Sequence, residues 1–133
     1  MKALRRRWLL LGPLLGGAAL LWSCVAPILT VPPPSAIAFT KSALTDSSGA
    51  QYWVASGPPL PQAANAVYYI RNEMLGQGVI VTGANDGSFA TSPPLPGNPG
   101  DHVLVDYQTP YGDYSDSACF VLPAAAGSAG LCP

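Results

Sequence analysis

The residue types that most often carry chemistry are few in this chain. Among its 133 residues there is one histidine, His102, with three cysteines and seven Asp and Glu residues. A zinc site needs several His or Cys side chains that converge on one point. A nucleophile elbow needs a Gly-x-Ser-x-Gly segment, and the sequence contains none. We therefore expect His102 to be a solvated strand residue, and we predict no metal site and no cofactor.

Two carboxylates, Asp113 and Asp116, stand close together in a predicted loop. Joined by Asp86 or Asp101 from other turns, they could offer oxygen ligands to calcium, although acidic residues in turns more often serve hydrogen bonding and solubility. The same pair could act as acid and base in an accessory protein or small hydrolase of the cell envelope. That role needs a fixed separation and one raised pKa, and two nearby loop residues give no reason to expect either. The sequence favours a protein that is not an enzyme.

Three tyrosines are candidates for ligand binding. Tyr69 alternates with an inward-facing neighbour, Tyr68, and should face solvent, while Tyr111 and Tyr114 lie in the predicted loop 109–116. Exposed tyrosines suit sugar stacking or a protein interface, because they offer a large contact area at low entropic cost. The alternative is that they pack under loops or fill the core of a small domain.

The basic residues gather at the N-terminus, where Lys2 and residues 5–7 hold four of the six positive charges. No charged residue follows until Lys41, and residues 8–21 are apolar. A basic start followed by an apolar stretch is typical of an export signal.

The apolar stretch ends in Leu21, Trp22, Ser23 and Cys24, which resembles the lipobox of bacterial lipoproteins. The resemblance implies cleavage before Cys24 and diacylation of its thiol, and two acyl chains hold a protein stably on a membrane. The alternative is a type II single-pass membrane protein, because the uncharged stretch 8–31 is long enough to span a bilayer. In either case the remaining chain lies outside the cytoplasm. In enterobacterial lipoproteins an Asp directly after the acylated Cys favours retention in the inner membrane. This chain has Val25 at that position, so we expect the outer membrane.

Removal of residues 1–23 leaves an acidic chain. It keeps two basic residues, Lys41 and Arg71, against all seven acidic residues, a net charge of −5. Such a chain lacks the dense basic face that nucleic-acid binding requires. Residues 24–34 carry four prolines and should form a semi-rigid tether of polyproline II.

Short apolar runs separated by Pro, Gly, Asn and Asp predict an all-β fold beyond the tether. The predicted strands are 36–43, 51–56, 66–72, 78–82, 88–91, 102–108 and 117–122. Asp86-Gly87 predicts a type I′ hairpin between the fourth and fifth of them, since that turn needs positive φ at both central residues. About seven short strands indicate a single antiparallel β-sandwich.

Several turns and strand ends are similar to those of bacterial immunoglobulin-like domains, including the carboxypeptidase-regulatory-like modules. The similarity rests on the strand 67–72 ending in Asn72, Gly76, the run 85–89 around Asp86-Gly87, and the turn Pro99-Gly100-Asp101. It implies one immunoglobulin-like β-sandwich over residues 35–122. These motifs specify turns and core positions and say almost nothing about function. The apolar leader ending in Cys24, the proline-rich tether, the strand pattern and the lack of a catalytic constellation together predict a non-catalytic binding or structural module of the envelope, with an envelope protein or glycan as partner.

With Cys24 assigned to lipid, Cys119 and Cys132 remain as an even pair in an oxidising compartment. A disulfide between them would tie the tail 123–133, which has little else to order it, to the last predicted strand. The alternative is two free thiols.

Overall fold

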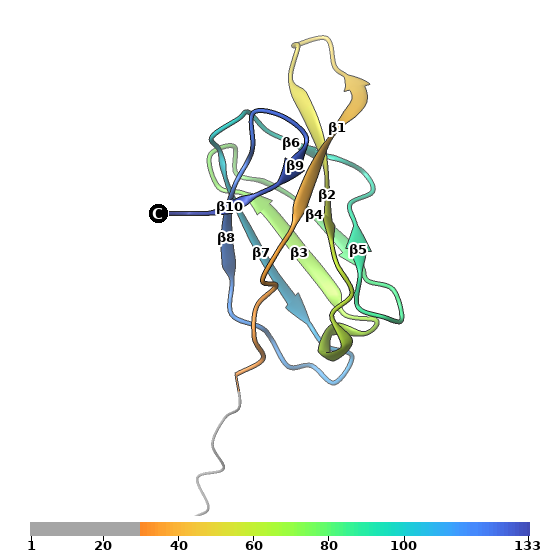
Figure 1. The fold of residues 1–133 in the computed structure, drawn as a ribbon. Coiled ribbons are helices and arrows are strands. Elements are labelled where there is room, and N and C mark those ends of the chain that lie inside the picture. The colour runs from red at the N-terminus through yellow and green to blue at the C-terminus, as the bar shows by residue number, and fades with distance from the viewer. Residues whose placement is uncertain (1–29) are drawn as a thin grey trace, which may run out of the picture.

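The computed structural model describes residues 30–133, which form two antiparallel sheets packed face to face (Figure 1). The first sheet has the order β5-β2-β1-β9, with β6 also paired to β2, and the second has the order β10-β8-β7-β3-β4. The strands of the first sheet are β1 (Ala38–Thr45), β2 (Gln51–Gly57), β5 (Phe89–Ala90), β6 (Leu95–Pro96) and β9 (Gly127–Ser128). Those of the second are β3 (Val67–Asn72), β4 (Gln77–Thr82), β7 (His102–Gln108), β8 (Ala118–Val121) and β10 (Gly130–Leu131). The prediction of an all-β sandwich is confirmed.

Helical structure in this part of the chain is confined to one short 3-10 turn, η1 (Pro61–Ala63). Over residues 30–133 no helix has the length and apolar character needed to cross a membrane. The predicted signal peptide 1–23, Cys24 and the first part of the tether lie outside the described residues.

The core lies between the sheets and follows the alternation of the strand sequences. In β3 and β7 every second side chain points inward, so that Tyr68, Ile70 and Tyr107 are buried. The Tyr68 ring stacks on Phe89 of the opposite sheet, with ring centroids 4.2 Å apart. Trp53 of β2 is fully buried, and its indole N–H donates a 3.0 Å hydrogen bond to the carbonyl oxygen of Gly97. The same alternation turns the intervening side chains, such as Tyr69, Arg71 and Leu104, toward the outer face of the second sheet.

The segment around Asp86-Gly87 does not form the predicted hairpin. β4 belongs to one sheet and β5 to the other, so residues 83–88 cross between the sheets instead of reversing within one. Only Gly87 has positive φ there, which excludes a type I′ turn at Asp86-Gly87. Tertiary contacts explain the difference, because the Tyr68 hydroxyl donates a 2.6 Å hydrogen bond to the Gly87 carbonyl. The Leu60 N–H also donates to the Asp86 carbonyl at 2.9 Å.

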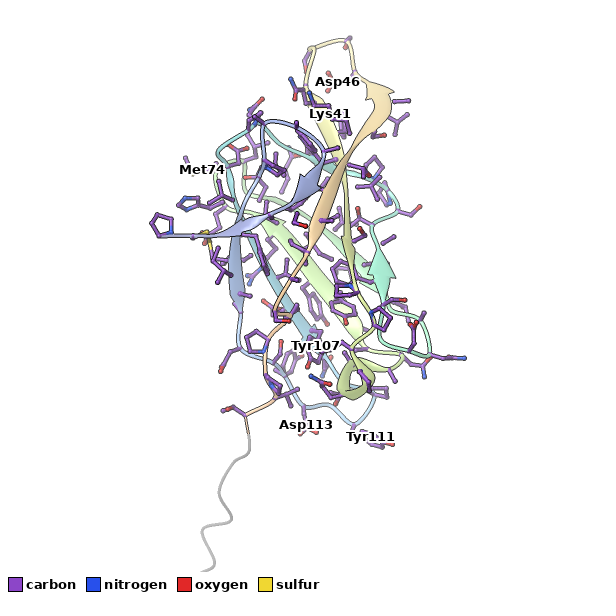
Figure 2. All side chains as sticks on the ribbon, viewed as in Figure 1. Lys41, Asp46, Met74, Tyr107, Tyr111 and Asp113 are labelled. Atoms are coloured by element: carbon purple, nitrogen blue, oxygen red, sulfur yellow. A yellow bond between two sulfur atoms is a disulfide. The ribbon has the colours of Figure 1, made fainter. Side chains whose placement is uncertain are left out.

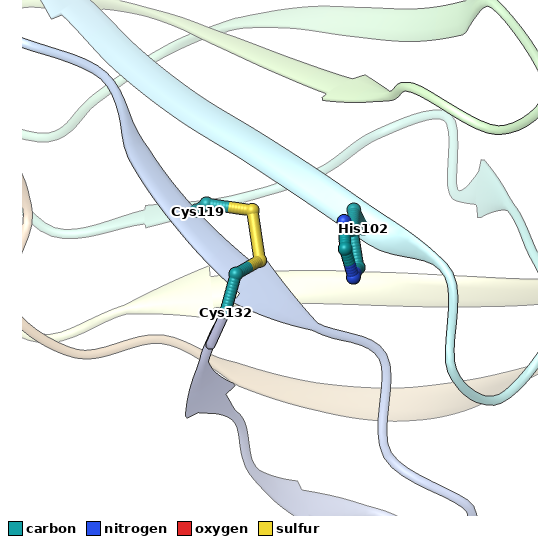
Figure 3. A group of neighbouring side chains, drawn as sticks. All are labelled: His102, Cys119 and Cys132. Atoms are coloured by element: carbon teal, nitrogen blue, oxygen red, sulfur yellow. A yellow bond between two sulfur atoms is a disulfide. The ribbon is translucent and has the colours of Figure 1, made fainter.

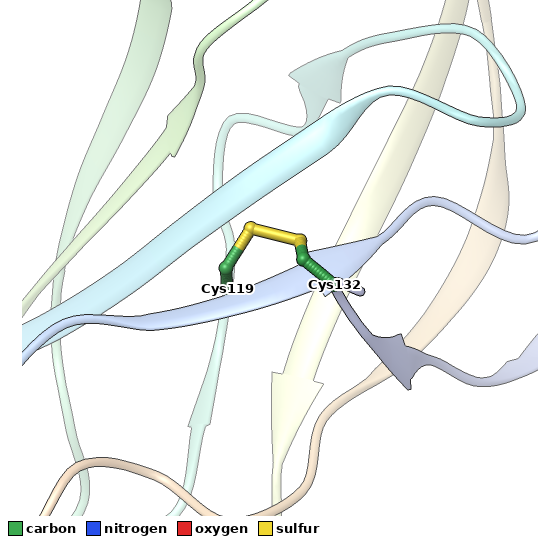
Figure 4. The surroundings of a disulfide bond; sticks show 2 residues. All are labelled: Cys119 and Cys132. Carbon is green, nitrogen blue, oxygen red and sulfur yellow. A yellow bond between two sulfur atoms is a disulfide. The ribbon is translucent and has the colours of Figure 1, made fainter.

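The C-terminal tail is more ordered than its composition predicts. β9 pairs with β1 of the first sheet, and β10 pairs with β8 of the second, so the tail joins one edge of each sheet. The predicted disulfide is present between Cys119 on β8 and Cys132 just after β10 (Figure 4). The expectation that the tail has little besides this bond to order it is wrong, because backbone pairing holds it as well.

The described part of the tether packs against the domain. Val31 forms a parallel bridge with Ser115, and the Tyr107 hydroxyl donates a 2.8 Å hydrogen bond to the carbonyl oxygen of Pro32. The tether therefore meets the sandwich beside the loop that joins β7 to β8. The opposite end carries the β1–β2 hairpin, which extends beyond the body of the domain (Figure 1).

Candidate functional site

The outer face of the second sheet carries a shallow groove of about 470 Å³. The pairing of the strands brings the side chains of this groove together. Tyr69 on β3 pairs with Ile80 of β4, and Arg71 on β3 pairs with Leu104 of β7. Partners across an antiparallel pair share one face of the sheet. The groove is lined by Tyr69, Arg71, Asn72, Glu73, Gly76, Gln77, Gly78, Val79, Ile80 and Leu104.

The chemistry of the groove is mainly apolar. Ile80 stays 65 % exposed, and Tyr69 and Leu104 are half-buried beside it. Arg71 donates a 2.8 Å hydrogen bond to Asp106, so the guanidinium is already paired with a carboxylate. At Gly78 a Cβ would lie 2.8 Å from the backbone oxygen of Ile70, which explains why this position has no side chain. The surface can therefore receive apolar or aromatic groups, beside the exposed polar side chains of Glu73 and Gln77.

One end of the groove is held by Asn72, which is completely buried at the end of β3. Its amide donates to Asp101 Oδ2 at 2.7 Å and to the Pro96 carbonyl at 3.1 Å. Its side-chain oxygen accepts the backbone N–H groups of Met74 and Leu75. The Asn-ending strand and the Pro-Gly-Asp turn, which the sequence shows as separate signals, thus meet in one hydrogen-bonded junction.

The three candidate tyrosines do not share a site. Tyr69 lines the groove, half-buried where solvent exposure was predicted, whereas Tyr111 and Tyr114 lie in the β7–β8 loop and are 92 % and 61 % exposed. Figure 2 places Tyr111 at the end of the domain where the tether arrives, far from Met74 at the groove end. Of the three tyrosines, only Tyr69 therefore belongs to the groove.

The acidic residues considered for calcium are not gathered either. Within residues 30–133, no group of three carboxylates includes Asp113 or Asp116. Asp86 accepts hydrogen bonds from the hydroxyl and backbone N–H of Ser88, and these lower the pKa of the Asp86 carboxyl below its usual range. Asp101 is engaged by Asn72, as described above. Asp86 therefore stabilises a turn and Asp101 belongs to the Asn72 junction. In the part of the chain that the structure describes, the acidic side chains considered for calcium do not form a cluster.

His102 has neighbours that the sequence does not show. It is half-buried on the outer face of β7, and its ring lies beside the disulfide (Figure 3). One ligand atom from each of His102, Cys119 and Cys132 lies within 4.8 Å of the others. The expectation that the chain cannot bring several His or Cys side chains together is therefore wrong. The β7–β8 register and the returning tail create this cluster, and neither can be inferred from one histidine and two distant cysteines.

No protein-family model matches the chain, and neither a curated protein nor a solved structure shows a significant match.

Proposed function

We propose that this chain is a non-catalytic lipoprotein of the bacterial envelope whose immunoglobulin-like domain binds an extended segment of another envelope protein. The observation that carries the proposal is the apolar groove beside β4, an edge strand of the second sheet. Among the described residues β4 pairs only with β3, so its other side offers backbone N–H and C=O groups to a further strand.

The sequence of β4 supports strand addition. Its six residues carry no charge and no proline, the two devices that most often protect a sheet edge. A strand added there would place alternate side chains next to Ile80 on the groove face, with Tyr69 of β3 on the far side of Ile80. A glycan is the less favoured occupant, because the groove is mainly apolar around Ile80, Tyr69 and Leu104.

The arrangement of the ends supports presentation away from a membrane. The tether joins the domain beside the β7–β8 loop, and Met74 at the groove end lies on the opposite side of the molecule (Figure 2). An acylated Cys24 would then hold the loop end toward the bilayer and leave the groove open to a partner.

Lipid attachment is tested by replacing the acylated residue. In a bacterial host, globomycin should block processing of the parent, and Cys24→Ser should abolish both that processing and the attachment of a labelled fatty acid. Ser23→Ala is the matched control, because it keeps a small residue before the cleavage point and should leave processing unchanged. A membrane-bound parent that is neither processed nor labelled with fatty acid would support the uncleaved single-pass form instead.

Binding at the groove is tested by site-specific photo-crosslinking in intact cells. A photoreactive amino acid at Ile80 should give a discrete crosslinked protein product. The same group at Leu44, which is 58 % exposed near the end of the β1–β2 hairpin, is the control and should not. Equal products from both positions, or a product containing only glycan, would contradict the proposed partner.

A further inference from the structure

The outer face of β7 and β8 brings a histidine next to the disulfide through strand register. Cys119 pairs with Leu104 and Val121 pairs with His102, so His102 and Cys119 lie diagonally on the same face of the sheet. Cys132 follows β10 directly and lies across from Cys119, to which it is bonded (Figure 4). Three side chains with metal-binding atoms thus meet at one point, all half-buried.

We propose that His102, Cys119 and Cys132 form a zinc site that exists only when the disulfide is reduced. Two thiolates and one imidazole nitrogen form a ligand set known from zinc sites, with a water molecule in the fourth position. In tetrahedral coordination, Zn–S bonds of about 2.3 Å put the sulfurs about 3.8 Å apart. The present spread, with all three ligand atoms within 4.8 Å of one another, needs only small side-chain movements once the S–S bond is open.

The tail stays in place without the disulfide, because backbone hydrogen bonds hold Cys132 near Cys119. The Cys132 N–H donates to the Cys119 carbonyl at 3.0 Å, and β10 remains paired with β8. Further back, the Ala129 N–H donates to the Ile37 carbonyl at 3.0 Å. Reduction therefore frees two sulfurs without freeing the strand that carries one of them.

The chemistry makes the site conditional on redox state. A dithiol reductant supplies two electrons and two protons, the disulfide becomes two thiols, and the reductant becomes a disulfide. Zn²⁺ then binds two thiolates and the imidazole, and the two thiol protons pass to solvent. Reoxidation by a disulfide oxidant re-forms the S–S bond and releases Zn²⁺, while the oxidant takes up two electrons and two protons. The disulfide sulfurs carry no negative charge, so the oxidised protein has only the histidine to offer.

The proposal is independent of what binds the groove, and it is tested with Co²⁺ as a spectroscopic probe for zinc. The full chain carries Cys24→Ser and is kept in mild detergent, so that Cys119 and Cys132 are its only cysteines. After reduction with dithiothreitol and its anaerobic removal, Co²⁺ should bind one per chain. A thiolate-to-cobalt charge-transfer band should appear, and Zn²⁺ should abolish it. The oxidised protein should show no such band.

Two variants separate a three-ligand site from a free dithiol. His102→Ala should weaken Co²⁺ binding by more than about 10-fold, the lower end of the loss seen when even an outer-shell partner of a metal is removed. Gln108→Ala alters the same half-buried face of β7 two strand positions beyond Asp106 and should bind as the parent does. Bound Zn²⁺ should also slow alkylation of both thiols in the parent and in Gln108→Ala, but much less in His102→Ala.

Each contrary result overturns the proposal. Absence of the charge-transfer band in the reduced parent, including through detachment of the tail, would show that no site forms. If His102→Ala bound Co²⁺ as tightly as the parent, the histidine would not be a ligand. If the oxidised protein bound Co²⁺ as well as the reduced protein, the site would not depend on reduction of the disulfide.

Discussion

The buried junction at Asn72 offers a sharp test of what holds the groove in place. Asn72→Ala removes four hydrogen bonds, two donated by the amide group and two accepted by its oxygen. A typical intramolecular hydrogen bond contributes about 0.5–1.5 kcal/mol net, which gives about 2–6 kcal/mol for the set. Met74 and Leu75 are exposed, so water can reach their freed N–H groups. We therefore expect a loss in the lower half of the range, about 3 kcal/mol.

Asn72→Asp tests the direction of these bonds at nearly constant volume. One side-chain oxygen still accepts the N–H groups of Met74 and Leu75. The other replaces the amide donor, and therefore faces Asp101 Oδ2 at the position where the present contact is 2.7 Å. Two acceptors then meet without a proton, and burial adds to the cost of the new charge. At pH 7 the loss should equal or exceed that of Asn72→Ala.

The pH dependence of Asn72→Asp has a defined sign. Burial and the neighbouring Asp101 raise the pKa of the introduced carboxyl in the folded state above its unfolded value of about 3.9. The folded state then holds more protons than the unfolded state between these two values. Stability of the variant relative to the parent should therefore rise as the pH falls through the raised pKa, and stay low above it.

The assay is urea unfolding of the full chain in mild detergent, followed by far-UV circular dichroism between pH 3 and 7. Asn85→Ala is the control, because Asn85 is exposed in the turn after β4, and it should change stability by no more than about 0.5 kcal/mol. A loss below about 1 kcal/mol for Asn72→Ala, or a pH-independent difference for Asn72→Asp, would refute this account of the junction.

Three further outcomes follow from buried contacts. Burial, aided by two nearby acidic groups, raises the pKa of Tyr68 to about 12, so unfolding free energy should fall between about pH 10 and pH 12. Tyr68→Phe should flatten that fall in urea titrations. Gly87→Ala should cost more than about 2 kcal/mol in the same assay, because φ is +81° and the new Cβ would overlap a backbone carbonyl. Cys119→Ser with Cys132→Ser should cost about 3 kcal/mol by loop-closure entropy, and an unchanged unfolding midpoint would contradict this.

The parts of the fold that sequence could predict are those governed by local alternation. His102–Gln108 was predicted with both bounds correct, and Tyr68, Val103 and Tyr107 face the core as their spacing requires. The two-residue strands β6, β9 and β10 were missed, because so short a segment has no period to detect.

Sequence alone could not predict which strands share a sheet. Asp86-Gly87 has the local chemistry of a hairpin, yet contacts with Tyr68 and Leu60 direct the chain into the other sheet. The same limit applies to the candidate sites. Register across three strands brings His102 to the disulfide and Leu104 to the groove, and register is a property of the assembled sheet.

The pairing of β9 with β1 has a consequence for the order in which the domain can form. Ala38, near the start of the described chain, pairs with Ser56 of β2 on one side and with Ser128, close to the end of the chain, on the other. During synthesis or passage across a membrane, an N-terminal-first chain exposes β1 and β2 long before β9 exists. The β1–β2 hairpin can form early by itself, but the other edge of β1 stays unpaired until the tail with β9 is available. Contacts so distant in sequence slow folding. A chaperone that binds the unpaired edge of β1 would therefore act in the interval before β9 pairs with it.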